Sequence, residues 1–299
     1  MPVAQQGIFA QGTRAHYQLE FDVSADASVD EIRTALCRLR EPTVTAGGLN
    51  IVMGLGPDLF RRLAPEAAPA TLHPFVPIDG PGGHAPATQH DIWIWLHGTG
   101  DDLVLDAARI VAAALSSVAK LALEQPAFVY RDSRDMTGFI DGTENPPVAE
   151  AHDVAVIPDG EVGAGGSFVI TIRWVHNLSA FNALEQSEQE GVFGRTKFDS
   201  VELDDDVKPP TAHIARVVVD DENGEELEIF RRSVPYGTVA EHGLFFIAFS
   251  ADISRFEIML ARMFGTTDDG VSDRLLSFTT PVTGSFYFAP AVEVLAEIC

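Results

Sequence analysis

Alternating apolar and polar residues predict that the chain begins with a strand followed by a helix. The segment A-H-Y-Q-L-E-F-D-V (15–23) alternates with the two-residue period of a strand. Ser28 and Glu31 then form a capping-box pattern, which marks a helix N-terminus. Apolar residues follow at helical spacing, namely Val29, Ile32, Leu36 and Leu39. The chain is therefore expected to pass from a strand into an amphipathic helix.

The rest of the first half repeats this pattern of strands and helices. The segments 48–56 and 92–96 are apolar runs, separated by a Pro/Gly-rich connection from 64 to 89. Asp101 or Asp102 is placed to cap a long Ala-rich helix that extends to about Lys120. A short strand, P-A-F-V-Y (126–130), is expected to follow.

The second half restarts the pattern. Residues 168–174 alternate along one strand face, and His242 opens the apolar run G-L-F-F-I-A-F-S. Asp252 is then expected to cap a helix that ends at Gly265 and turns four apolar residues inward, Ile253, Phe256, Leu260 and Met263. The runs that open at His90 and His242 look like one unit used twice.

These patterns predict an α+β fold of two halves, each an antiparallel sheet with helices on one face. The Gly-rich segment V-I-P-D-G-E-V-G-A-G-G (156–166) has the composition of a link. We therefore expect a link near 147–165 and divide the chain into residues 1–147 and 148–299.

Composition excludes several classes of function. The 299 residues are 46% apolar, enough for a sizeable core, and 20 basic against 44 acidic side chains give a formal charge of −24. Nucleic acids and anionic membranes would be repelled. No apolar run approaches the roughly 18 residues of a membrane span. The first twenty residues also lack the pattern of a signal peptide, so the cytoplasm is the expected compartment.

Cysteine usage excludes two further kinds of site. Cys37 and Cys299 are the only cysteines, so neither a disulfide framework nor a Cys-rich metal site is expected. The C-x-x-C-H pattern of covalently attached haem is absent as well.

A loop with one central carboxylate is the first candidate for chemistry. In G-F-I-D-G-T-E-N-P (138–146), glycines and an Asn-Pro pair fix the backbone, and Asp141 and Glu144 are the only ionisable groups. The loop is suited to holding a carboxylate. A structural role is also open, because Asp before Gly is a common turn pair whose carboxylate bonds its own backbone.

Two other stretches carry candidate side chains. P-P-T-A-H-I-A-R (209–216) carries His213, and I-F-R-R-S-V-P-Y-G (229–237) carries Arg231, Arg232 and Ser233. Taken alone, a histidine beside an apolar segment is more often a hydrogen-bonded core residue than a ligand. An arginine pair at a strand end is more often a solvated face.

Together and in this order, the stretches resemble the dye-decolourising peroxidase family, most closely its bacterial intracellular B/P-type branch. The resemblance rests on the loop at 138, on A-H-I-A-R with His213 placed 72 residues after Asp141 (213 − 141), on R-R-S-V-P-Y-G at 231, and on F-T-T-P-V-T-G-S-F-Y-F-A-P at 278–290. It implies two ferredoxin-like halves, one haem b per chain held in the C-terminal half, and a homo-oligomer.

The resemblance also implies roles for individual residues. His213 falls at the family's axial iron ligand, Asp141 at its distal acid and Arg231 at its distal arginine. A carboxylate on the second ring nitrogen of His213 would favour O–O cleavage, and Asp273 is the predicted partner. With an ordinary pKa of about 3.9, Asp141 is expected to be an ionised base. Arg231 is expected to stabilise the peroxide anion and to contribute more than Asp141.

The remaining pocket residues are assigned with alternatives. Arg195, in G-R-T-K, is a candidate partner of the haem propionates, although an ordinary exposed arginine is equally open. Thr143 and Glu144 are placed in the cofactor pocket. Ser233 stands where many relatives have an asparagine, and its shorter side chain has no amide donor for peroxide.

The predicted function is a haem b peroxidase that reduces hydrogen peroxide and oxidises dyes, phenolics or similar small one-electron donors through a ferryl intermediate. Iron removal from haem, and haem storage or sensing without turnover, are the alternatives. A scaffold that binds no haem is the remaining option. Peroxide-dependent turnover with unchanged haem would distinguish the first hypothesis from the others.

Overall fold

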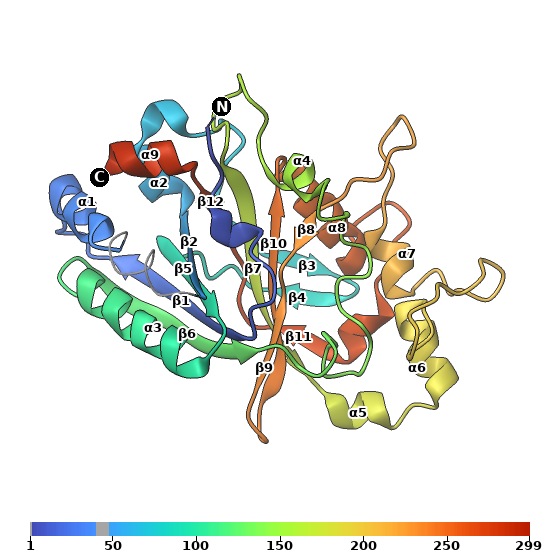
Figure 1. Ribbon diagram of the computed structural model, residues 1–299. Coiled ribbons are helices and arrows are strands. Elements are labelled where there is room, and N and C mark those ends of the chain that lie inside the picture. Colours follow the sequence, from blue (N-terminus) through green and yellow to red (C-terminus); the bar gives the residue numbers. More distant parts are fainter. Residues whose placement is uncertain (1, 40–47) are drawn as a thin grey trace.

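The computed structural model describes residues 2–39 and 48–299, and in this part of the chain two similar halves share one large antiparallel sheet (Figure 1). The first half supplies β1 (Ala15–Val23), β2 (Leu49–Leu55), β5 (Ile92–Gly98) and β6 (Ala119–Phe128). The second half supplies β7 (Ser167–His176), β8 (Phe230–Arg231), β9 (Val234–Gly237), β10 (His242–Ser250), β11 (Thr279–Pro281) and β12 (Ser285–Ala289). A separate small hairpin is formed by β3 (Ile78–Gly80) and β4 (Gly83–Ala85).

The strand order is the same in both halves. The sheet runs β6-β1-β5-β2 and continues as β12-β7-β10-β8, with β9 also paired to β10. In each half the last strand pairs with the first, the first with the third, and the third with the second. This is the order of a ferredoxin-like unit. The predicted α+β fold with two ferredoxin-like halves is confirmed, and the two sheets are joined where Phe288 of β12 pairs with Leu55 of β2.

Helices cover the outer face of each half (Figure 1). In the first half these are α1 (Val29–Cys37), α2 (Pro57–Leu63) and α3 (Asp101–Leu115). In the second half α8 (Ser254–Phe264) lines the same cavity as β7 and β10, and α7 (His213–Val217) packs beside α8. Shorter helices complete the described chain: α4 (Ala151–Ala155), α5 (Leu178–Asn182), α6 (Gln186–Phe193) and α9 (Val292–Ile298), with 3-10 turns at Gln6–Ile8, Pro65–Ala67 and Arg274–Ser277.

Three local expectations need correction. The helix that starts at Asp101 ends at Leu115, and Lys120 lies in β6, a ten-residue strand in place of the short one expected at 126–130. The helix N-cap is Gly100, so the two acids only occupy the first turn, where they favour the positive end of the helix dipole. Pairing with the whole of β1 outweighs the helix propensity of residues 119–124.

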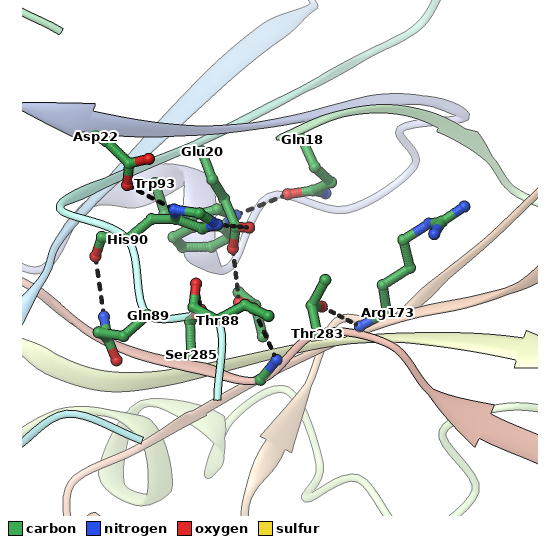
Figure 2. A network of polar contacts seen from close by, with 12 residues as sticks. Gln18, Glu20, Asp22, Thr88, Gln89, His90, Trp93, Arg173, Thr283 and Ser285 are labelled. Carbon is green, nitrogen blue, oxygen red and sulfur yellow. Dashed lines mark hydrogen bonds and ion pairs between the residues drawn. The ribbon is translucent and has the colours of Figure 1, made fainter. Parts of the chain in front are cut away.

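A polar cluster joins the two halves inside the sheet (Figure 2). Glu20 of β1 is fully buried, and its Oε1 accepts hydrogen bonds from Thr171 Oγ1 of β7 and Tyr287 Oη of β12, both at 3.0 Å. His90 links the cluster to Asp22 through a 2.7 Å contact. Burial raises the pKa of Glu20 above its ordinary value. The halves are therefore joined by hydrogen bonds as well as by apolar packing.

Within residues 2–39 and 48–299, none of the helices combines the length and apolar character needed to cross a bilayer.

Candidate active site

A large apolar cavity lies between the outer face of the second half's sheet and the helices α7 and α8. The centre of a water-sized sphere can occupy about 180 Å³ of this space, which is open to solvent on one side. One wall comes from alternate residues of β7 and β10, including Ile170, Ile172 and Phe246, and α8 supplies the facing wall with Phe256, Met259, Leu260 and Met263. An apolar cavity between a sheet face and a helix suits a flat, apolar ligand.

His213 lines this cavity and is held by a carboxylate. It is the first residue of α7, and its Nδ1 lies 2.6 Å from Asp273 Oδ2. Asp273 is 2% exposed, and its second oxygen accepts a hydrogen bond from the backbone N–H of Leu275 at 2.8 Å. These bonds fix the ring so that Nδ1 carries the proton and Nε2 keeps a free lone pair.

A second histidine in the cavity wall has no such free nitrogen. His176 Nε2 lies 3.0 Å from Asp135 Oδ1, and its Nδ1 lies 2.8 Å from Thr279 Oγ1. For His213, by contrast, Nε2 has no hydrogen-bond partner among the described residues. Of the two histidines that line this cavity, only His213 is free to bind a metal ion through an unpaired ring nitrogen.

The loop at 138–146 places Asp141 in the wall of the same cavity. Gly138 and Gly142 have φ values of 93° and 78°, a backbone conformation that glycine adopts without a steric penalty. The side chain of Asn145 accepts a hydrogen bond from Arg231 N and donates one to Arg231 O, both at 2.8 Å. The loop is thereby fastened to β8, and Asp141 and Arg231 line the cavity together.

The proton affinity of Asp141 differs from the sequence-based expectation. Burial raises the pKa of Asp141 to about 6, against the opposing effect of the Arg231 guanidinium. Burial also lowers the pKa of Arg231, with the Asp141 carboxylate acting in the other direction. The expected ordinary pKa of about 3.9 is therefore wrong, because that value assumes a carboxyl group in water. Asp141 is an acceptor of protons near neutral pH and a donor in mild acid.

The other cofactor-pocket candidates gather at one side of the cavity. Arg195, Glu144 and Thr143 all line it, and Arg195 forms an ion pair with Glu144. Arg195 Nη1 also donates to Ser200 O at 2.6 Å. The arginine is thus partly buried and held in place, which disfavours the alternative of an ordinary exposed side chain.

Ser233 and Arg232 lie in the wall of an adjoining polar cavity. This second cavity shares Asp141, Gly142 and Arg231 with the first, whereas Ser233 lines only the second. Ser233 Oγ accepts a 3.4 Å hydrogen bond from Ile247 N. Arg232 donates to the carbonyl oxygens of Ile8 and Ala10 at 2.5 and 2.7 Å, so it fastens the N-terminal segment.

Sequence reasoning missed three residues of this site. Asn145 was interpreted only as part of an Asn-Pro turn, and Asp135 and His176 received no role. The spacing of Asp135 before Asp141 carries no recognisable pattern, and His176 is the last residue of a mostly apolar strand. A polar residue at the end of a buried strand was the one available signal for His176.

Comparisons with known proteins agree along the chain. Residues 5–128 match the family model for the N-terminal part of Dyp-type peroxidases, and residues 132–294 match the model for the C-terminal part. The chain belongs to the Dyp-type peroxidase family. The expected family, the fold and the function of a dye-decolourising peroxidase are thereby confirmed.

Individual relatives of this peroxidase match over nearly their whole length. A dye-decolorizing peroxidase of Rhodococcus erythropolis is 37% identical over 305 residues, which cover 99% of this chain and 89% of the relative. One from Mycolicibacterium paratuberculosis is 38% identical, covering 99% and 86%. The structure of a DypB variant of Rhodococcus jostii RHA1 in complex with heme has a TM-score of 0.92 and 35% identity, with all of both chains covered.

Proposed function

We propose that this Dyp-type peroxidase binds one haem b per chain in the large cavity, with His213 Nε2 as the iron ligand. The observation that carries the proposal is the free ring nitrogen of His213, which faces an apolar cavity between the sheet and α8. The heme in the similar Rhodococcus jostii structure supports the choice of cofactor. Arg195, Thr143 and Glu144 lie at the polar side of the cavity, where propionates would find a cation.

Each residue of the chain then has a separate task. Bound haem supplies the iron at which hydrogen peroxide is reduced and the oxidising equivalents that pass to an electron donor. Asp273 accepts a hydrogen bond from the Nδ1–H of His213, which would make Nε2 a better electron donor to the metal. Asp141 would take the proton from one oxygen of hydrogen peroxide and return it to the other oxygen, which leaves as water. Arg231 stabilises the negative charge that develops between these two transfers.

We infer that Arg231 contributes more to peroxide reduction than Asp141, because a fixed cation acts at every pH whereas Asp141 is ionised only above about pH 6. Ser233 lines the adjoining cavity that opens beside both residues, where its hydroxyl can hold a water molecule. Peroxide is the oxidant, and dyes, phenolics or similar small one-electron donors are the reductants.

We further propose a division of the chain at 147/148, a cytoplasmic location and a homo-oligomeric assembly. The division falls in the connection between β6, the last strand of the first half, and β7, the first strand of the second half. Sedimentation of the purified protein tests the assembly.

The proposal is tested by adding haem to the haem-free protein and recording the absorption spectrum, then adding peroxide and a dye. Histidine-ligated haem and peroxide-dependent loss of the dye colour are expected for the parent chain, and neither is expected for His213→Ala. His84→Ala, which changes an exposed histidine outside the cavity, is the control. Release of metal-free porphyrin would instead indicate iron removal from haem. A colourless protein after haem addition would overturn the proposal.

A further inference from the structure

Asp135 and His176 form a fully bonded buried pair in the wall of the cavity. Asp135 is 8% exposed, and its Oδ1 lies 3.0 Å from His176 Nε2. Its Oδ2 accepts hydrogen bonds from the backbone N–H and the hydroxyl of Thr137 at 2.8 and 2.6 Å. His176 Nδ1 is engaged by Thr279 Oγ1, which lies opposite it on β11. Every ring nitrogen and carboxylate oxygen of the pair has a hydrogen-bond partner, so the pair presents no free ring nitrogen to the cavity.

The pair lies at the tip of the backbone turn that carries Asp141. Asp135 N donates to Phe139 O, and Gly138 N donates to Asp135 O, both at 2.9 Å. Arg134 and Ile140 form an antiparallel bridge, and Asp141 N donates to Ser133 O at 3.1 Å. Residues 133–141 are therefore a small hairpin with Asp135 near its turn and Asp141 at its end.

This hairpin reaches the second half's sheet through two polar anchors. One is the Asp135–His176 pair, which ties it to the end of β7. The other is Asn145, which ties the following residues to Arg231 of β8. Asp141 lies between the two anchors in sequence. Because β7 and β8 flank β10 in one sheet, the anchors span the face that lines the cavity.

We propose that Asp135 and His176 are positioning residues for Asp141: the hydrogen bond between them fixes the 133–141 hairpin on β7 and so holds the Asp141 carboxyl in the cavity wall. The role of Asp141 itself rests on the proposed function, but its placement does not.

The charge of Asp135 acts on Asp141 as well. Burial opposes ionisation of Asp135, but the hydrogen bond and charge of His176 and the two bonds from Thr137 outweigh it, so the pKa of Asp135 lies below its ordinary value. Burial raises the pKa of Asp141, and the negative charge of an ionised Asp135 raises it further. Arg231 and His213 act on Asp141 in the opposite direction. The pair therefore helps to keep Asp141 protonatable near neutral pH.

Two substitutions of Asp135 separate the bonds from the charge. In Asp135→Asn, the side-chain oxygen can still accept from Thr137, and the amide can donate to His176 Nε2 once the ring proton moves to Nδ1 and is donated to Thr279 Oγ1. All bonds are then kept without the charge. Asp135→Ala removes both. Asp132→Asn removes a charge from an exposed position of the same loop and is the matched control.

Hydrogen exchange of the full-length, haem-loaded protein reads out the placement of the hairpin. Asp135→Ala is expected to speed amide exchange in residues 133–141 by about tenfold or more, the factor that follows from losing a buried hydrogen-bonded carboxylate. Asp135→Asn and Asp132→Asn are expected to keep the parent's protection. Parent-like protection in Asp135→Ala would overturn the proposal.

Carboxyl NMR of the full-length, haem-free chain reads out the charge. The resonance of Asp141 is identified by its loss in Asp141→Asn. Its titration midpoint is expected to move to lower pH in Asp135→Asn and to stay in place in Asp132→Asn. An unchanged midpoint in Asp135→Asn would overturn the electrostatic part. The proposed role of Asp141 is tested by a separate measurement. It fails if the Asp141→Asn enzyme reduces peroxide at the parent's rate.

Discussion

His213 Nδ1 and Asp273 Oδ2 lie 2.6 Å apart, although 60 residues separate them in the sequence. The short contact connects the first residue of α7 with the segment that follows α8. Since Asp273 N also donates to Met263 O at 2.8 Å, the carboxylate is fixed to the end of α8. The orientation of the His213 ring is therefore set by the packing of two helices.

Replacing Asp273 by Asn is expected to weaken haem binding by roughly 10–100-fold, the usual effect of losing the carboxylate behind a metal-bound histidine. The reduction potential of the iron should rise, because a neutral partner makes the imidazole a poorer electron donor. Titration of the haem-free protein with haem, followed by potentiometry, measures both effects. Asp268→Asn, at an exposed position on the same segment, is the control. Unchanged affinity and potential would show that Asp273 has no influence on the ligand.

Removing the guanidinium in Arg231→Leu is expected to slow peroxide reduction by roughly 10²–10³-fold, the range found when a donor that stabilises developing negative charge is lost. Asp141→Ala is expected to have the smaller effect above pH 7. Stopped-flow mixing of the haem-loaded variants with peroxide gives the rate constants. The ordering would be contradicted if Asp141→Ala abolished the reaction while the Arg231 variant reacted at the parent's rate.

The rate of peroxide reduction is expected to depend on pH through Asp141. Its pKa of about 6 means that the ionised base is lost as the pH falls through that value. The second-order rate constant should therefore fall as the pH drops below about 6, down to the rate that Arg231 sustains when Asp141 is protonated, and level off above it. A pH series on the parent and on Asp141→Asn checks this, because the variant should lack the acid limb. An identical limb in both proteins would assign it to another group.

The same pKa predicts a stability effect. A folded-state pKa of about 6 against an ordinary 3.8 means that the folded chain binds the proton more tightly, so stability is lost as the pH rises between these values. Asp141→Asn, which mimics the protonated form, should melt above the parent at pH 7.5 and close to it at pH 4. Thermal unfolding of the haem-free proteins at both pH values measures the difference. An equal shift at both would contradict the linkage to Asp141.

Truncating Asn145 to Ala is expected to leave the backbone N–H and C=O of Arg231 without partners, because Asn145 bonds both. The expected cost is about 1–3 kcal/mol for each buried group left unsatisfied. Peroxide reduction should slow as well, since Asp141 and Arg231 would no longer be held together. Denaturant unfolding and stopped-flow kinetics measure the two effects. Asn223→Ala, on an exposed turn that does not itself line the cavity, should change neither.

The sequence by itself determined the local elements and the chemistry of three stretches. Alternation over 15–23, the capping box at Ser28 and the glycine that ends α8 all depend on neighbouring residues, so the patterns predicted them. The strongly specified loop at 138–146 identified Asp141 without any knowledge of its surroundings. Gly138 and Gly142 adopt positive φ values, which other residues rarely do, so glycine at these positions is a signal that can be read from the sequence alone.

Only the tertiary structure decided which groups meet and what charge they carry. Strand β6 overrode the helix propensity of residues 119–124, because its backbone pairs with β1 from Ala119 to Phe128. The pKa of Asp141 depends on desolvation by residues distant in sequence, and the partners of His176 come from positions 41 residues before it and 103 residues after it. Electrostatics and side-chain packing act through space, which is why a linear pattern carries so little of either.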